Sequence, residues 1–190
     1  MRNLIYLVAC TADGFIARQD GSFDCFPVEG DHIAGLIESF PEMIPGHLRG
    51  PLGVRAANRQ FDTVLMGRRT YEVGLAAGVT SPYPHLKQYV FSRQMTRSPD
   101  AEVELVSGDA VGLVRGLKGQ AGRDIWLCGG GDLAAALLPE LDGLILKVNP
   151  LLLGTGIPLV AGAAQPTGLE LTGSKGYGSG VIVLHYRVRH

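Results

Sequence analysis

Apolar runs alternate with segments of helical periodicity along most of the chain, and this alternation predicts its architecture. Residues 4–10 are continuously apolar and include β-branched and aromatic side chains, as in a strand that is covered on both faces. Similar runs predict strands at 63–66, 88–92, 124–128 and 143–149. Strands that alternate with helices favour parallel pairing, with helices packed on both faces of the sheet.

The helices are predicted from apolar residues that recur at spacings of three and four. This pattern indicates helices at 31–40 and 109–118, a helix after the turn at Gly67, and another at 132–141. Residues 11–30 instead contain Asp-Gly pairs, so we expect a long, mobile loop there.

Two further segments depart from the βα alternation. Residues 41–59 are rich in Pro and Gly but too apolar for a disordered linker, so we expect an ordered loop that borders a pocket. Apolar runs at 169–174 and 181–188 flank a glycine-rich turn with no room for a crossover helix. They predict a hairpin whose last strand runs antiparallel to its neighbours.

Composition limits the choices of domain number and partner. A chain of 190 residues that is 46% hydrophobic can bury one sizeable core, so we expect a single domain over residues 1–190. The net charge of −1 provides no basic field for nucleic acid or for an anionic membrane surface. We therefore expect the partners to be a small-molecule substrate and further copies of the chain.

The cysteines and histidines argue against a metal site. Cys10, Cys25 and Cys128 are odd in number and form no CxxC pair, which favours neither a disulfide framework nor structural zinc. The five histidines form no HxxH or HExxH arrangement. The first apolar run is too short for a secretory leader, and no run reaches the length of a membrane span. A reducing cytoplasm is the expected location.

Two glycine-marked turns carry the candidate chemistry. Gly67-Arg68-Arg69-Thr70 follows one apolar strand, and Gly129-Gly130-Gly131 follows another, and each turn opens into a helix. Free backbone N–H groups at a helix N-terminus attract anions. Glycines leave out the Cβ atoms that would keep a ligand from the backbone. The two turns together predict a site for the two phosphate regions of a dinucleotide.

These turns, in this order, carry a resemblance to a known family. With residues 89–93 between them, residues 7–17 before them and residues 141–159 after them, the sequence resembles the dihydrofolate reductase-like superfamily. It is most similar to stand-alone relatives of the reductase domain in the bifunctional riboflavin-biosynthesis deaminase-reductase. The resemblance implies an α/β, three-layer fold with a mostly parallel sheet, helices on both faces and an antiparallel C-terminal strand. It also implies NADPH as the cofactor and hydride transfer as the chemistry.

The resemblance assigns cofactor roles by position. Gly67 to Thr70 match the phosphate side of NADPH, while Ser92 and Arg93 match a second contact to its 2′-phosphate. Gly129 to Gly131 match the pyrophosphate and the nicotinamide ribose. Ala9, Ile16 and Ala17 match the contacts around the nicotinamide ring, where hydride transfer takes place, and the Asp13 loop is expected to fold over it. The full set of implied cofactor residues is Ala9, Ile16, Ala17, Gly67, Arg68, Arg69, Thr70, Ser92, Arg93, Gly129, Gly130, Gly131, Asp132 and Leu133.

The proton donor is not fixed by the sequence. Reduction of C=N or C=O needs a proton as well as a hydride. Asp24, Glu29 and Asp31 lie near the family's substrate-side acid, and Asp31 also suits a helix cap. Water is an alternative donor, so the catalytic residue stays open, with Asp24 and Asp31 as candidates.

Four departures from the family pattern leave the substrate open. Asp132 stands where the family often has a neutral or small residue, and we expect its carboxylate to cap the following helix. Gly143 replaces an acid, and the first helix has no clear pterin-binding pattern of an acid and an aromatic residue. The signature of the fused zinc deaminase is also missing. Two functions remain. One is an NADPH-dependent reductase of a small heterocyclic, carbonyl or imine substrate that resembles a pterin, a folate or a pyrimidine precursor of riboflavin, and the other is a non-catalytic nucleotide-binding or regulatory protein. A homodimer is expected, through the sheet edge or an apolar patch at residues 151–153.

Overall fold

An eight-stranded sheet forms the centre of the protein. The computed structural model describes residues 1–162 and 165–190. In spatial order the strands are β5 (Val103–Val106), β4 (Lys87–Phe91), β3 (Phe61–Gly67), β6 (Asp124–Gly129), β1 (Leu4–Thr11), β7 (Gly143–Asn149), β10 (Ile182–Arg189) and β9 (Gly168–Gly176). The first six are mutually parallel, and β10 is antiparallel to both β7 and β9.

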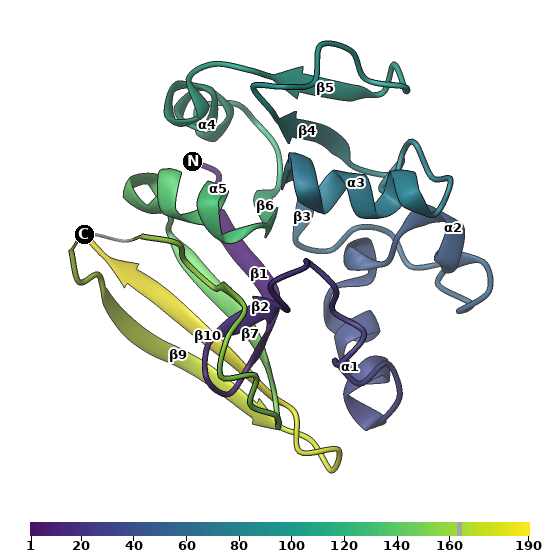
Figure 1. The fold of residues 1–190 in the computed structure, drawn as a ribbon, viewed down its shortest axis with the longest axis vertical. Helices are drawn as coiled ribbons and strands as arrows, with labels where there is room; N and C mark the ends of the chain where they lie inside the picture. The colour runs from purple at the N-terminus through teal and green to yellow at the C-terminus, as the bar shows by residue number, and fades with distance from the viewer. Residues whose placement is uncertain (163–164) are drawn as a thin grey trace.

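Helices cover both faces of this sheet, as Figure 1 shows. On one face lie α1 (Asp31–Ser39) and α3 (Arg68–Ala76), and on the other lie α4 (Ala110–Lys118) and α5 (Gly131–Ala136). Short helical turns complete the chain: η1 (Pro41–Met43), α2 (Gly46–Arg49) and η2 (Leu138–Glu140). The α/β fold with a mostly parallel sheet and an antiparallel C-terminal strand is therefore confirmed.

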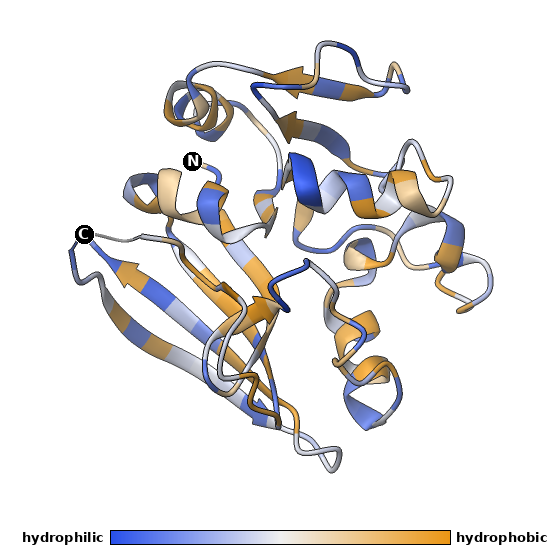
Figure 2. Ribbon diagram, in the orientation of Figure 1, coloured by the Kyte–Doolittle hydropathy of each residue, from blue (hydrophilic) through white to orange (hydrophobic). Residues whose placement is uncertain are grey.

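The core follows from the apolar runs. Leu4 and Tyr6 on β1 pack toward α4 and α5, while Leu7 packs toward α1 and α3. β1 is apolar at almost every position. In Figure 2, β9 and β10 instead mix polar and apolar residues along their length. A strand buried on both faces needs apolar residues at every position, whereas a strand with one open face needs them at every second position.

The sequence missed three strands. β5 is only four residues long and lies at the sheet edge, with Glu104 in its middle. Edge strands bury little surface, so their apolar signal is weak. β2 (Phe15–Ala17) and β8 (Ile157–Pro158) pair only with each other, in a second sheet. The first part of the predicted mobile loop is therefore held in place by this pairing.

The helix predicted at 132–141 is shorter than expected. α5 ends at Ala136, and the chain continues as the 3-10 turn η2 around Pro139. Proline has no N–H for the helical hydrogen bond and clashes with the preceding turn, which ends the helix. No helix in the described part of the chain is long and apolar enough to cross a membrane.

The ordered loop predicted at 41–59 is held by a buried carboxylate. Glu42 is fully buried, and its Oε1 accepts hydrogen bonds of 2.7 Å from the backbone N–H groups of Gln60 and Phe61. These bonds fix the loop against the start of β3. None of its residues lines the large cavity described below, but Met43 of η1 lines the smaller cavity beside it, so the loop does border a pocket.

Candidate functional site

A large cavity opens at the carboxyl ends of the parallel strands. Its volume is about 1270 Å³, and its walls come from the ends of β1, β3, β4, β5 and β6 and from the starts of α3, α4 and α5. Ligand sites in open α/β sheets lie at this edge. All fourteen residues that the resemblance assigned to the cofactor line this one cavity.

The first glycine turn presents the start of α3 to the cavity. Gly67 is the N-cap residue, and no side chain caps the helix. The first N–H groups of α3 therefore have no intrahelical acceptor and face the cavity wall with the positive end of the helix dipole.

The two arginines of this turn differ in their surroundings. Arg68 Nη1 lies 2.7 Å from Glu72 Oε1 on the next turn, whereas Arg69 is exposed and forms no ion pair among the described residues.

The three glycines of the second turn differ in what a side chain would meet at each position. Gly129 has φ +148°, which side chains rarely adopt, and its peptide bond to Gly130 is cis. A Cβ on Gly130 would lie in the cavity, 3.8 Å from Ile16 Cδ1 and 3.9 Å from Thr70 Oγ1. A Cβ on Gly131 would collide with the carbonyl oxygen of Pro158. Only Gly130 therefore lacks a structural reason of its own to be glycine.

Asp132 does not cap the helix, contrary to expectation. The N-cap residue of α5 is Gly130, and no side-chain cap hydrogen bond is present. A capping side chain must precede the first helical residue, and Asp132 lies inside the first turn. Its exposed carboxylate lines the cavity instead.

The predicted nicotinamide end is built from two loops joined by Asp13. The Asp13 carboxylate accepts hydrogen bonds from Thr11 Oγ1 at 2.5 Å and from the backbone N–H of Gly154 at 2.7 Å. These bonds lower the pKa of Asp13, the Thr11 bond being the largest cause. The β2–β8 pairing next to this contact holds Ile16 and Ala17 at the cavity wall.

Ser92 and Arg93 lie on the turn after β4. Ser92 is buried, and its Oγ accepts hydrogen bonds from the backbone N–H groups of Gln94 and Met95, at 3.1 and 2.9 Å. The Ser92 hydroxyl therefore shapes the turn, while Arg93 stays exposed at the cavity.

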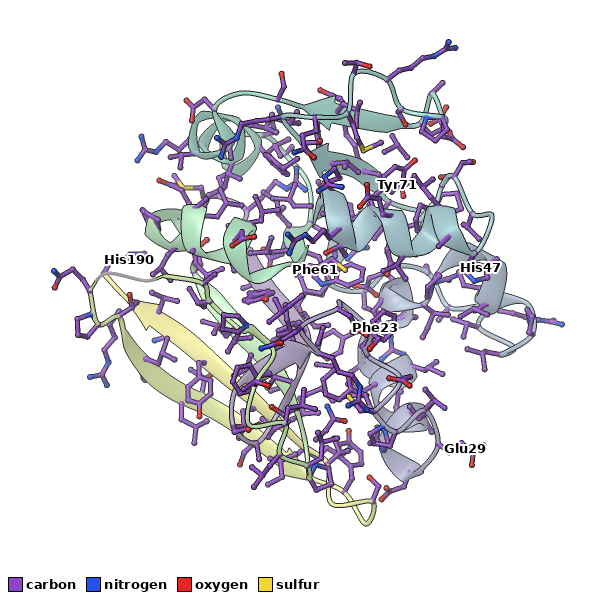
Figure 3. All side chains as sticks on the ribbon, viewed as in Figure 1. Phe23, Glu29, His47, Phe61, Tyr71 and His190 are labelled. Atoms are coloured by element: carbon purple, nitrogen blue, oxygen red, sulfur yellow. The ribbon has the colours of Figure 1, made fainter. Side chains whose placement is uncertain are left out.

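Several lining residues were missed in the sequence. Residues 107–111, which comprise the connection from β5 and the start of α4, form one wall. Phe23 and Phe26 come from the loop after β2. Gly108 and Asp109 after an apolar run could have indicated the first of these, because the same pattern marked the two glycine turns. The two phenylalanines carry no comparable signal. Figure 3 shows Phe23 over the middle of the molecule.

None of the three candidate acids lines the cavity. Asp31 accepts hydrogen bonds from the N–H groups of Gly178 and Ser179, at 2.7 and 3.0 Å, which tie α1 to the β9–β10 hairpin and lower the Asp31 pKa. Asp24 is exposed and lies 3.4 Å from Arg18 Nε. Glu29 projects outward beside the start of α1 (Figure 3). Asp31 does not cap α1, contrary to expectation, because the N-cap residue is Gly30 and Asp31 is the first helical residue. Its carboxylate caps a neighbouring turn instead, because the hairpin comes within reach of the helix start.

A smaller cavity adjoins the large one across β1. It has a volume of about 70 Å³ and shares Val8 and Ala9 with the large cavity. The side chains of α1, η1, β7 and β10 complete its lining, and Lys147 is its one charged residue. Burial lowers the pKa of Lys147.

Cys128 also lines the large cavity. Burial raises the pKa of its thiol to about 12, so it is neutral at physiological pH. Reactive cysteines have the opposite shift.

The chain matches known proteins in sequence and in fold. Residues 2–183 match the family described as the RibD C-terminal domain. The uncharacterized proteins YwjB and YyaP of Bacillus subtilis (strain 168) are 32% and 26% identical to the chain. The YwjB match covers 97% of both chains, and the YyaP match covers 97% of this chain and 94% of YyaP.

Two solved structures share the fold. A Shewanella sp. PV-4 protein assigned provisionally to riboflavin biosynthesis superimposes with a TM-score of 0.73 at 22% identity, over 100% of both chains. The diaminohydroxyphosphoribosylaminopyrimidine deaminase/5-amino-6-(5-phosphoribosylamino)uracil reductase of Thermotoga maritima superimposes with a TM-score of 0.66 at 14% identity. That match covers 99% of this chain and 57% of the Thermotoga chain.

Proposed function

Because the chain belongs to the RibD C-terminal domain family, which has a dihydrofolate reductase-like fold, we propose that it is an NADPH-dependent reductase of a small carbonyl, imine or heterocyclic substrate. One observation carries the proposal. The uncapped starts of α3 and α5 open onto the same cavity, next to a glycine whose missing Cβ leaves room for a ligand. A dinucleotide needs two phosphate regions held at once, and this arrangement offers both.

The cavity is also large enough for the cofactor and a substrate together. Its 1270 Å³ exceeds the roughly 300–1000 Å³ that is typical of small-molecule sites. When bound, NADPH supplies a hydride. The residues of this chain would hold it at the backbone of the two glycine turns and would exclude water at Ala9, Ile16 and Ala17.

Arg69 and Arg93 are the proposed contacts to the 2′-phosphate. Both line the cavity, both are exposed, and neither forms an ion pair within the described residues. The Arg68 guanidinium is instead engaged by Glu72. A guanidinium binds phosphate through two parallel hydrogen bonds, so free arginines are the suitable partners.

The test is calorimetric titration with NADPH and NADH. A charge-assisted hydrogen bond is worth roughly 1.5–3 kcal/mol, so we expect NADPH to bind on the order of tenfold or more tightly than NADH. The substitution Arg69→Gln should remove most of that preference without changing NADH affinity. Arg97→Gln, on an exposed arginine outside the cavity, is the matched control.

Turnover separates the reductase from the non-catalytic alternative. Oxidation of NADPH in the presence of pterins, folates, pyrimidine precursors and simple carbonyl compounds supports the proposal. Tight NADPH binding with no oxidation across this panel would favour a nucleotide-binding or regulatory protein, and equal affinities for NADPH and NADH would contradict the cofactor assignment.

A further inference from the structure

Lys147 places a single cation in an apolar cavity beside the predicted hydride-transfer position. In the sheet register it lies opposite Ala9 on β1 and opposite Val183 on β10. Paired residues on neighbouring strands point to the same face, so these three side chains share one face of the sheet. Leu36 of α1 and Met43 of η1 close the cavity over them. Ala9 also lines the large cavity. A group that reaches past Ala9 from the large cavity therefore meets Lys147.

Lys147 has no carboxylate partner among the described residues. The contrast is Lys118, whose Nζ lies 2.7 Å from Asp142 Oδ2 and 2.9 Å from the Glu140 carbonyl oxygen. An unpaired ammonium in apolar surroundings is costly to bury, and burial alone lowers the Lys147 pKa. Packing would be better served by an apolar side chain of the same length.

The titratable groups on the surrounding elements do not replace that missing partner. On α1, His32 is buried, and its pKa is lowered by burial and by the charge of Lys147; Asp31 is occupied by the hairpin. On β10, burial also lowers the pKa of His185. β1 and η1 contribute only apolar residues to the cavity. Lys147 is therefore the charge that a ligand in this cavity would meet.

We propose that the Lys147 ammonium binds and protonates the carbonyl oxygen of the substrate, which makes Lys147 the proton donor and the substrate an aldehyde, a ketone or another carbonyl compound. This inference rests on the proposed reductase function. The small cavity suits the carbonyl end of a substrate rather than a whole ring, because about 70 Å³ is only a few water molecules in size.

The step balances without a further reactant. The carbonyl carbon would take a hydride from NADPH bound in the large cavity. The π electron pair of the carbonyl moves to its oxygen, which takes one proton from Lys147 Nζ. The neutral amine then regains a proton from solvent, so one carbonyl, one hydride and one proton give one alcohol. The positive charge of Lys147 stabilises the negative charge that develops on the carbonyl oxygen.

Reductive alkylation of the wild-type protein tests the site without NADPH. Acetaldehyde forms an imine with a neutral amine and releases water, and cyanoborohydride reduces the imine to a stable secondary amine. The chain has four lysines, at 87, 118, 147 and 175, so peptide mass spectrometry can follow each one. We expect Lys147 to react several-fold faster than Lys87 at neutral pH, with a rate that saturates as acetaldehyde increases. A Lys147 rate that is no faster, or that stays linear, would overturn the proposal.

Two variants test the role in turnover. Lys147→Met removes the ammonium and keeps the length of the side chain. We expect kcat/KM for carbonyl substrates to fall by about 10²–10⁴-fold while NADPH affinity is unchanged. Lys87→Met, on an exposed lysine of β4, is the matched control and should keep wild-type values.

The outcomes of the two tests are distinguishable. Unchanged kcat/KM in Lys147→Met would overturn the role of Lys147 and leave the reductase function standing. If the wild-type protein does not bind or oxidise NADPH, the reductase function fails, and the alkylation pattern still decides whether this cavity accepts a carbonyl group.

Discussion

Gly130 and Gly131 are adjacent, but they are glycine for different reasons. Gly130 has φ −99° and ψ −166°, an extended conformation that other residues adopt, and its missing Cβ leaves space in the cavity. Gly131 is needed because the Pro158 carbonyl oxygen occupies the place of a Cβ. The sequence could identify the turn from three consecutive glycines. It could not separate their roles, because the neighbour that decides them lies in a different loop.

The two residues therefore make a matched pair of variants. We expect Gly130→Ala to weaken NADPH binding by at least tenfold with little change in melting temperature, because the added methyl group lies where the pyrophosphate is expected. Gly131→Ala should lower the melting temperature by several degrees, because the β2–β8 sheet must shift to make room. Titration and thermal melting of both variants check this. Intact affinity in Gly130→Ala would show that the cavity does not hold the dinucleotide at this turn.

At the scale of elements, the sequence predicted the central strands, which are buried on both faces of the sheet. It missed the short strands β2 and β8, which form only because two distant loops pair with each other. β1, β3, β6 and β7 each contain at least three consecutive apolar residues, so the local sequence was sufficient to predict them. β2 and β8 have only three and two residues, and each exists because the other lies beside it. No local pattern encodes that pairing.

The Asp13 carboxylate joins the same two loops through hydrogen bonds to the loop that precedes β8. We expect Asp13→Ala to speed hydrogen exchange at the amides of Leu153 and Gly154, which donate to that carboxylate, and to weaken NADPH binding several-fold. Asp24→Ala, on an exposed carboxylate that does not contact these amides, is the control.

The pH dependence of this contact has a definite sign. The Asp13 pKa is lowered, first by the Thr11 hydrogen bond, so the folded protein keeps the carboxylate ionised at pH values where a free aspartate begins to protonate. The contribution to stability is thus fully present above the ordinary Asp pKa of about 3.9 and is lost as pH falls through the lowered value. A loss of protection from hydrogen exchange at the Gly154 amide that already begins between pH 6 and 5 would contradict this assignment.

At the scale of the whole molecule, the sheet leaves one apolar surface uncovered. Leu169 and Leu171 on β9 are 40% and 54% exposed, and Ile182 on β10 is 44% exposed. Figures 1 and 2 show these two strands extending beyond the helices, with apolar positions along them. The other patch expected from the sequence is smaller than its three leucines indicated. Only Leu152 is exposed, at 75%, because Leu151 and Leu153 are drawn into the loop contact with residues 12 and 13.

Self-association should therefore use β9 and β10 rather than the loop at Leu152. An apolar surface on an edge strand is a liability in a monomer, and a two-fold dimer would bury it. We expect a dimer mass by sedimentation velocity at micromolar concentration, and a shift to monomer in Leu171→Glu with the fold retained by circular dichroism. Leu152→Glu introduces the same charge at the other exposed leucine and should remain dimeric. A monomeric wild-type protein would contradict the dimer itself, whereas dissociation of Leu152→Glu alone would move the interface to the loop.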